Sequence, residues 1–141
     1  MITETKTSSS ILWSIVAVVA GFLVTAILSL GTDSVLHATG VYPPWLQPMS
    51  DSLFILASAY RVVFTVLGSY VTARLAPATP LRHALILGGI GFLAASLGAV
   101  ATWNAEPPLG PKWYPIMLVV TAIPCCWLGG KIRESQLVSH I

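Results

Sequence analysis

The sequence predicts an all-α fold, a bundle of four transmembrane helices with both termini in the cytoplasm. Of its 141 residues, 55% are hydrophobic and only 9% are charged, whereas a soluble domain has about 25% charged residues. Two uncharged runs, residues 11–30 and 84–103, each match the roughly 20 residues that a helix needs to cross a bilayer. We therefore expect lipid to be the outer solvent of a single membrane domain. The helices are expected at about residues 11–37, 51–75, 82–104 and 113–130 of the domain 1–141.

The first expected helix follows a polar start in which serines at positions 8, 9 and 10 offer an N-cap. A cleaved signal peptide is the alternative, but its apolar core would be only 7–15 residues long. A retained helix fits the longer run better. We expect it to continue through Asp33 toward His37 and to stop before the prolines and tryptophan of the segment 40–50.

The second expected helix, residues 51–75, carries a charge near its middle, Arg61. Ser50 or Asp51 is placed to cap its start, and a short link with two prolines follows its end near Arg74. A cation in hydrocarbon costs from about 3 to more than 10 kcal/mol, so Arg61 must face protein, water or a counter-charge. The rest of the fold is therefore expected to shelter Arg61.

The third expected helix is rich in glycine and alanine. Small residues three and four positions apart let helix backbones approach closely in lipid. The face with Gly91 and Ala95 is accordingly interpreted as a helix-packing surface. The fourth helix is expected to start at Trp113, to bend at Pro124, and to end at the glycine pair 129–130.

The distribution of basic residues predicts the orientation, since cytoplasmic loops of membrane proteins carry an excess of lysine and arginine. If the N-terminus is inside, Lys112 is the one lysine or arginine that lies in an outer loop. The inner segments hold the other basic residues outside the helix centres: Lys6, Arg74, Arg82, Lys131 and Arg133. We expect a multi-pass protein of the cell membrane, either a plasma membrane or a bacterial inner membrane.

An internal repeat is suggested by residues 21–32 and 91–102, which align without gaps. Chance identity is high in such an apolar composition. If the repeat is real, it predicts two parallel hairpins related by an axis along the membrane normal.

Arg61 is the leading candidate site residue, and Asp33 is its expected counter-ion because both lie toward the outer side of their helices. Asp51 is the second candidate partner. The face of the second helix that carries Arg61 also carries a polar stripe of small residues. Its members are Ser58, Thr65, Gly68, Ser69 and Thr72. The stripe predicts either helix packing around a buried ion pair or a water-filled path or ligand pocket.

His37 follows Asp33 by four residues, so the two share a helix face if the helix continues that far. A carboxylate can orient an imidazole for proton transfer or metal binding. Glu106 lies in the second outer loop, and together with Asp33 and Asp51 it makes three carboxylates at one membrane face. Their spacing alone does not bring them together, and neither a metal site nor a cofactor is predicted.

Other chemistry has little support in the sequence. A net charge of +2 and the lack of a basic run give no indication of nucleic-acid binding. Cys125 and Cys126 are adjacent, which disfavours a disulfide, so both are interpreted as small apolar residues of a helix. The chain shows no serine elbow, P-loop, dinucleotide-binding glycine motif or zinc-protease motif.

The sequence therefore favours a non-enzymatic transport or permeation unit, or an accessory membrane subunit, organised around Arg61. We expect it to act in the lipid bilayer as a homo-oligomer or as a subunit of a membrane complex. The alternative is a membrane-embedded enzyme that acts on a lipid-like substrate. An enzyme would bring at least two of Asp33, His37, Asp51 and Glu106 to one cleft. A transport unit would instead show a polar cavity that reaches Arg61.

Overall fold

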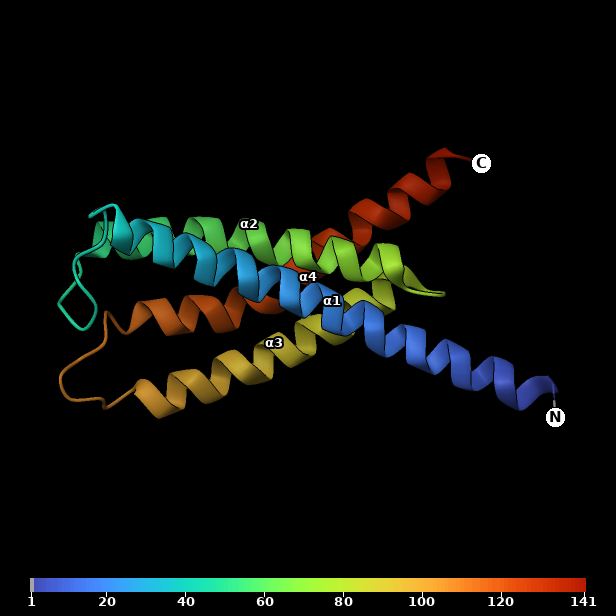
Figure 1. The fold of residues 1–141 in the computed structure, drawn as a ribbon, viewed down its shortest axis with the longest axis horizontal. Helices are drawn as coiled ribbons and strands as arrows, with labels where there is room; N and C mark the ends of the chain where they lie inside the picture. Colours follow the sequence, from blue (N-terminus) through green and yellow to red (C-terminus); the bar gives the residue numbers. More distant parts are fainter. Residues whose placement is uncertain (1) are drawn as a thin grey trace.

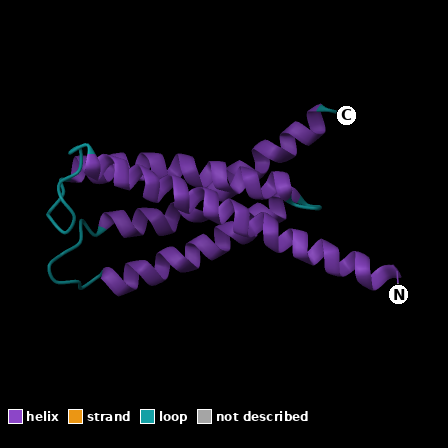
Figure 2. Ribbon diagram, in the orientation of Figure 1, coloured by secondary structure: helices purple, strands orange, loops and turns teal. Residues whose placement is uncertain are grey.

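The computed structural model describes residues 2–141, with side chains from Thr7 onward, and every regular element in this range is a helix (Figures 1 and 2). All four helices are long and apolar enough to cross a membrane. The predicted all-α, four-helix architecture is thus confirmed. The helices are α1 (Ile2–Ala38), α2 (Asp51–Leu75), α3 (Pro80–Thr102) and α4 (Trp113–Ser139).

The helices run up and down, so that the bundle has two unlike ends (Figure 1). The loops 39–50 and 103–112 form what we call the loop end. Both chain termini and the short link 76–79 lie toward the opposite, terminal end. The N-terminal part of α1 and the C-terminal part of α4 diverge from the bundle there (Figure 1). Helix α2 packs against all three other helices and is the centre of the fold.

Helices α1 and α2 cross at a pair of glycines. A Cβ atom added to Gly68 would lie 2.6 Å from the carbonyl oxygen of Gly21, so the two backbones are in direct contact. Beside this crossing, the buried Thr72 hydroxyl donates a 3.0 Å hydrogen bond to the carbonyl oxygen of Ala17. In lipid, where no hydrophobic effect draws helices together, such close approach and interhelical hydrogen bonds stabilise the bundle.

The prediction that the glycine pair ends the fourth helix is wrong, because α4 continues to Ser139. A Cβ atom at Gly129 would collide with the Ser69 side chain of α2, and one at Gly130 would lie 2.8 Å from the Ala84 Cβ of α3. A helical glycine costs about 1 kcal/mol relative to alanine. Here the glycines let α4 approach both neighbours, and that close packing offsets the cost. Pro124 lies inside α4.

Other helix boundaries also differ from expectation. Helix α1 begins at Ile2, so the serines at positions 8–10 lie within it and do not cap it. Helix α2 has the predicted bounds, with Ser50 at the N-cap position but without a side-chain capping hydrogen bond. Helix α3 begins at Pro80, two residues before the predicted start. Proline suits the first turn of a helix because the N–H it lacks has no partner there.

The packing surface of α3 lies one turn from the expected one. A Cβ atom at Gly88 would lie 3.0 Å from the Cys126 Cβ of α4, whereas one at Gly91 would meet nothing closer than 3.9 Å. Gly91 and Ala95 instead line a cavity. Both cysteines are buried and free, in keeping with a packing role.

Candidate functional site

Arg61 and Asp33 meet between α1 and α2. An Arg61 Nη2 N–H donates a hydrogen bond to Asp33 Oδ2, and the two groups form an ion pair. The side chains are 28% and 14% exposed in the absence of lipid. The pair is therefore largely enclosed by protein. Arg61 and Asp33 both lie in the loop-end halves of their helices. At that end, α1 runs toward Ala38 and α2 begins at Asp51.

Two tyrosines complete the surroundings of Asp33. The Tyr60 hydroxyl donates a hydrogen bond to Asp33 Oδ1, so each carboxylate oxygen accepts from a different donor. Tyr42, from the loop 39–50, is 3% exposed, and its hydroxyl lies 3.1 Å from that of Tyr60. Because Tyr60 gives its proton to Asp33, Tyr42 donates to the Tyr60 oxygen, and the Leu53 carbonyl oxygen lies 3.4 Å from Tyr42 as a longer alternative acceptor. This chain fixes the carboxylate and anchors the first loop to the bundle.

The ion pair leaves hydrogen-bonding capacity unused. Arg61 Nε is buried without a hydrogen-bond partner, as is the hydroxyl of Ser29, a residue that is 4% exposed. A guanidinium carries five N–H donors. An unsatisfied buried polar group costs about 1–3 kcal/mol. Both residues would therefore gain from a further acceptor oxygen within reach.

A cavity of about 360 Å³ adjoins these residues. Every helix contributes to its wall, and most of the lining side chains are apolar or small. Arg61, Ser29 and three threonine hydroxyls supply the polar part. The lining residues include Thr25, Ser29, Arg61, Thr65, Leu87, Gly91, Ala95, Leu118, Thr121 and Cys126. Ser29 and Arg61 both line the cavity, so a bound acceptor oxygen would lie near residues with unused donors.

Among the residues predicted for the site, the structure brings Arg61 and Asp33 together. Helix α1 does continue past His37, yet the imidazole turns away from Asp33. Its Nδ1 lies 2.7 Å from the Pro43 carbonyl oxygen, and its ring stacks on Trp45 with centroids 3.7 Å apart. His37 therefore holds the loop 39–50 against the end of α1.

Asp51 and Glu106 lie apart from the ion pair. Asp51 is the exposed first residue of α2, and Glu106 lines a different cavity, under the loop 103–112. Over residues 7–141, no side-chain hydrogen bond or ion pair joins any two of Asp33, His37, Asp51 and Glu106. Among the described residues, no group of three or more potential ligands is arranged to hold a metal ion.

The polar stripe of α2 divides between packing and cavity. Ser69 and Thr72 are fully buried, and Gly68 is buried at the α1 crossing. Thr65 lines the cavity with Arg61. The Ser58 hydroxyl donates back to the Phe54 carbonyl oxygen within α2. Packing thus accounts for Gly68, Ser69 and Thr72, whereas Thr65 borders the cavity.

The sequence did not assign Tyr42, Tyr60 or Ser29 to the Arg61 site. Tyr60 precedes Arg61 directly, and a carboxylate in an apolar setting needs more than one donor because it has two oxygens to satisfy. That requirement points to Tyr60. Nothing in the sequence relates Tyr42 to Asp33, since Tyr42 enters from a loop.

Comparisons of the chain with models of protein families, with curated proteins and with solved structures find no match.

Proposed function

We propose that this protein is a transport or permeation unit, or the accessory subunit of one, that binds an anionic amphiphile at Arg61. The observation that carries the proposal is the cavity of about 360 Å³ at an arginine with donors to spare. Apolar walls suit a hydrocarbon chain, and a guanidinium suits a carboxylate or phosphate oxygen. A purely structural ion pair has no need of an adjoining cavity.

Asp33 gives the site a way to release its ligand. Because Asp33 already neutralises Arg61, an entering anion must share or displace that carboxylate. Binding is then weak enough for the ligand to leave, which transport requires. Tyr60 would hold Asp33 in position during the exchange, since its hydroxyl bonds the oxygen that Arg61 does not use.

The remaining parts of the proposal concern the protein in its membrane. The excess of basic residues near the terminal end supports an orientation in the cell membrane with the loop end outside and both termini in the cytoplasm. An anionic ligand would then approach Arg61 from the outer side. A homo-oligomer or a larger complex would cover the side of α3 that carries Gly98, where an added Cβ atom would meet nothing within 4 Å. The enzyme hypothesis has less support, because its four residues do not converge.

The test compares two probes with the same chain, dodecanoate and dodecyltrimethylammonium, by calorimetric titration of the purified protein. The wild type should bind dodecanoate about tenfold more tightly, the equivalent of one charge-assisted hydrogen bond. The Arg61→Leu/Asp33→Leu variant removes both charges, and isosteric replacement of a buried ion pair is often tolerated. It should fold and bind both probes equally.

The matched control is Lys131→Leu/Glu134→Leu, which removes an exposed ion pair at the terminal end. It should keep the preference for dodecanoate. Transport is measured as the movement of fluorescent phosphatidylglycerol between the leaflets of proteoliposomes. We expect movement with the wild type and the control but not with the Arg61/Asp33 variant. An unchanged preference for dodecanoate in that variant would contradict the proposal.

A further inference from the structure

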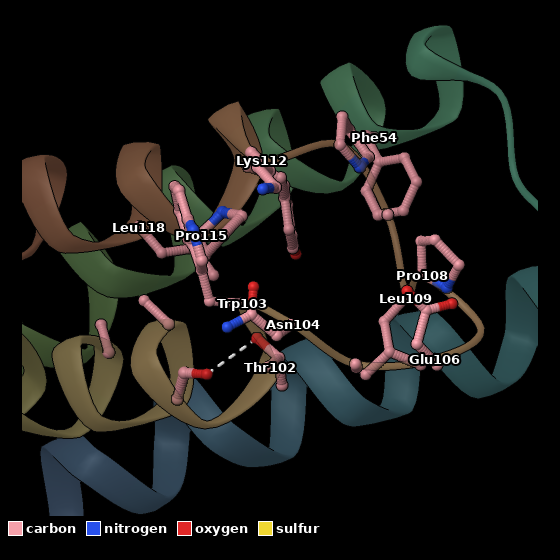
Figure 3. Close-up of a pocket in the computed structure, with 17 residues that line it drawn as sticks. Phe54, Thr102, Trp103, Asn104, Glu106, Pro108, Leu109, Lys112, Pro115 and Leu118 are labelled. Atoms are coloured by element: carbon pink, nitrogen blue, oxygen red, sulfur yellow. Dashed lines mark hydrogen bonds between the residues drawn. The ribbon is translucent and has the colours of Figure 1, made fainter.

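A second cavity, of about 450 Å³, lies at the loop end, outside the Arg61 site. The loop 103–112 covers it, with residues of α3 on one side, residues of α4 on the other, and Phe54 from the start of α2 (Figure 3). Glu106, which the sequence offered as a candidate site residue, lies in this loop. The position of the cavity at the ends of α3 and α4 corresponds to the headgroup level of a bilayer, where tryptophan and tyrosine are enriched.

The cover over this cavity is held in place. A Cβ atom at Gly110 would collide with the Phe54 ring, so the loop backbone rests directly on that side chain. Phe54 is 7% exposed and packs against Tyr114 of α4, with ring centroids 5.0 Å apart. The loop is thus pinned to two helices, and the cavity beneath it is a defined feature of the fold.

The rim of the cavity carries one charge of each sign. Glu106 and Lys112 both line it. Over residues 7–141, neither forms an ion pair with another residue. Lys112 Nζ lies 4.9 Å from the centroid of the Trp103 ring, a cation–π contact that holds the ammonium group over the α3 side. Asn104 adds an amide at the same level (Figure 3).

The deeper part of the cavity is apolar. Its walls are formed by small residues of α3 and by Pro115 and Leu118 of α4. Ala95 and Leu118 also line the Arg61 cavity, so the two spaces adjoin at these side chains. A molecule that fits here has a polar head with both charges and a hydrocarbon chain that extends toward the membrane interior.

We propose that this cavity binds the headgroup of a zwitterionic phospholipid with a primary amine, of the phosphatidylethanolamine type. The phosphate would accept from the Lys112 ammonium and the Asn104 amide, and the amine would donate to the Glu106 carboxylate. The start of an acyl chain would pack on Ala99 and Leu118. A soluble zwitterion would leave the apolar half unfilled, which is why the structure favours a lipid.

The test measures retention of added lipids by the purified protein in native mass spectra, with phosphatidylethanolamine and phosphatidylglycerol of identical chains. It is performed on the wild type and in the Gly91→Leu background, because Gly91 lines the Arg61 cavity alone and the larger side chain would fill it. Gly91→Leu should prefer phosphatidylethanolamine by about tenfold, and the variants below are compared in this background, because the wild type would also retain phosphatidylglycerol at the Arg61 site. Failure at the Arg61 site therefore leaves this result unaffected.

Three variants locate the contacts. Glu106→Gln should abolish the preference by lowering phosphatidylethanolamine retention alone, whereas Lys112→Gln should lower the retention of both lipids. Ala99→Leu, which narrows the apolar part, should lower both while keeping their ratio. The control Glu134→Gln, on α4 at the terminal end, should change neither. The inference is overturned if Gly91→Leu shows no preference, or if Glu106→Gln in that background leaves the preference intact.

Discussion

The two halves of the bundle differ in how closely their helices pack. Toward the terminal end, the helices cross at small residues with backbones in direct contact, as at Gly21 with Gly68 and at Gly129 with Ser69. Toward the loop end, α1 and α3 separate (Figure 1). The cavity under the loop 103–112 and the ion pair lie there, and the Arg61 cavity extends from the ion pair as far as Leu87 of α3. The helices diverge toward the loop end because they cross closely at the terminal end and carry larger side chains at the loop end.

This difference shows how four helices form both a stable bundle and a cavity between them. The crossings supply close van der Waals contact and interhelical hydrogen bonds, which hold membrane helices together. The loop-end half can therefore contain unfilled space and hydrogen-bond donors without a partner, at Ser29 and Arg61. Stability and binding are thus assigned to different segments of the same helices.

The largest effect is expected from Gly68→Leu in the close-packed half. A Cβ atom there would lie 2.6 Å from a backbone oxygen of α1, which moves only if the helices part. Overpacking of this kind costs about 3 kcal/mol or more. The matched control is Gly89→Leu, since a Cβ atom at Gly89 meets nothing within 4 Å. In thermal unfolding in detergent, Gly68→Leu should lower the melting temperature strongly, and Gly89→Leu should leave it almost unchanged.

In the loop half, Arg61→Leu alone should destabilise the protein by about 3–5 kcal/mol, because Asp33 is left charged in an enclosed site. The double variant Arg61→Leu/Asp33→Leu should recover most of this loss. Denaturant titrations of the three proteins check the expectation. Equal stability of the single and double variants would mean that Asp33 reaches water, contrary to the enclosed pair.

A smaller effect is expected from Tyr60→Phe, which removes one donor to Asp33. The free energy of unfolding should fall by about 1–3 kcal/mol, the cost of an unsatisfied buried acceptor. Tyr70→Phe is the matched comparison, since Tyr70 donates a 2.8 Å hydrogen bond to Gln136 near the terminal end. Its loss should be smaller because it leaves a neutral acceptor. The reverse order, measured by the same titrations, would show that Asp33 does not depend on Tyr60.

The smallest change in stability is expected from two residues in the loops at the two ends of the bundle. Thr79 and Leu46 have positive φ values of 43° and 69°. A side chain in the left-handed region costs about 1–2 kcal/mol, and glycine avoids most of this cost. Thr79→Gly and Leu46→Gly should therefore each raise the free energy of unfolding by up to about 1 kcal/mol. A loss of stability in either variant would show that its side chain makes a stabilising contact.

The sequence was sufficient for the architecture, since uncharged runs and prolines locate four membrane helices. It misplaced the end of the last helix, because the glycines at 129 and 130 have the same local signature whether they stop a helix or allow close packing. Only the tertiary partners Ser69 and Ala84 decide between the two. The length of α1 was missed for a related reason, as a serine cap is a local preference that a longer helix overrides.

For the candidate site, the sequence contained the charges but not the geometry. The depth of Arg61 and Asp33 in their helices was readable from the chain. The direction of the His37 ring was not, because it depends on how the loop 39–50 folds back onto α1. The cavity under the loop 103–112 was also not readable, since it depends on how that loop lies over α3, α4 and Phe54.

The most direct test of the account fills the Arg61 cavity without touching its charges. Gly91→Leu places a side chain in that cavity, and Gly89→Leu places the same side chain two residues away, outside it. Calorimetric titration with dodecanoate should show loss of binding for Gly91→Leu and wild-type binding for Gly89→Leu. Equal binding by both variants would contradict the assignment of the ligand to this cavity.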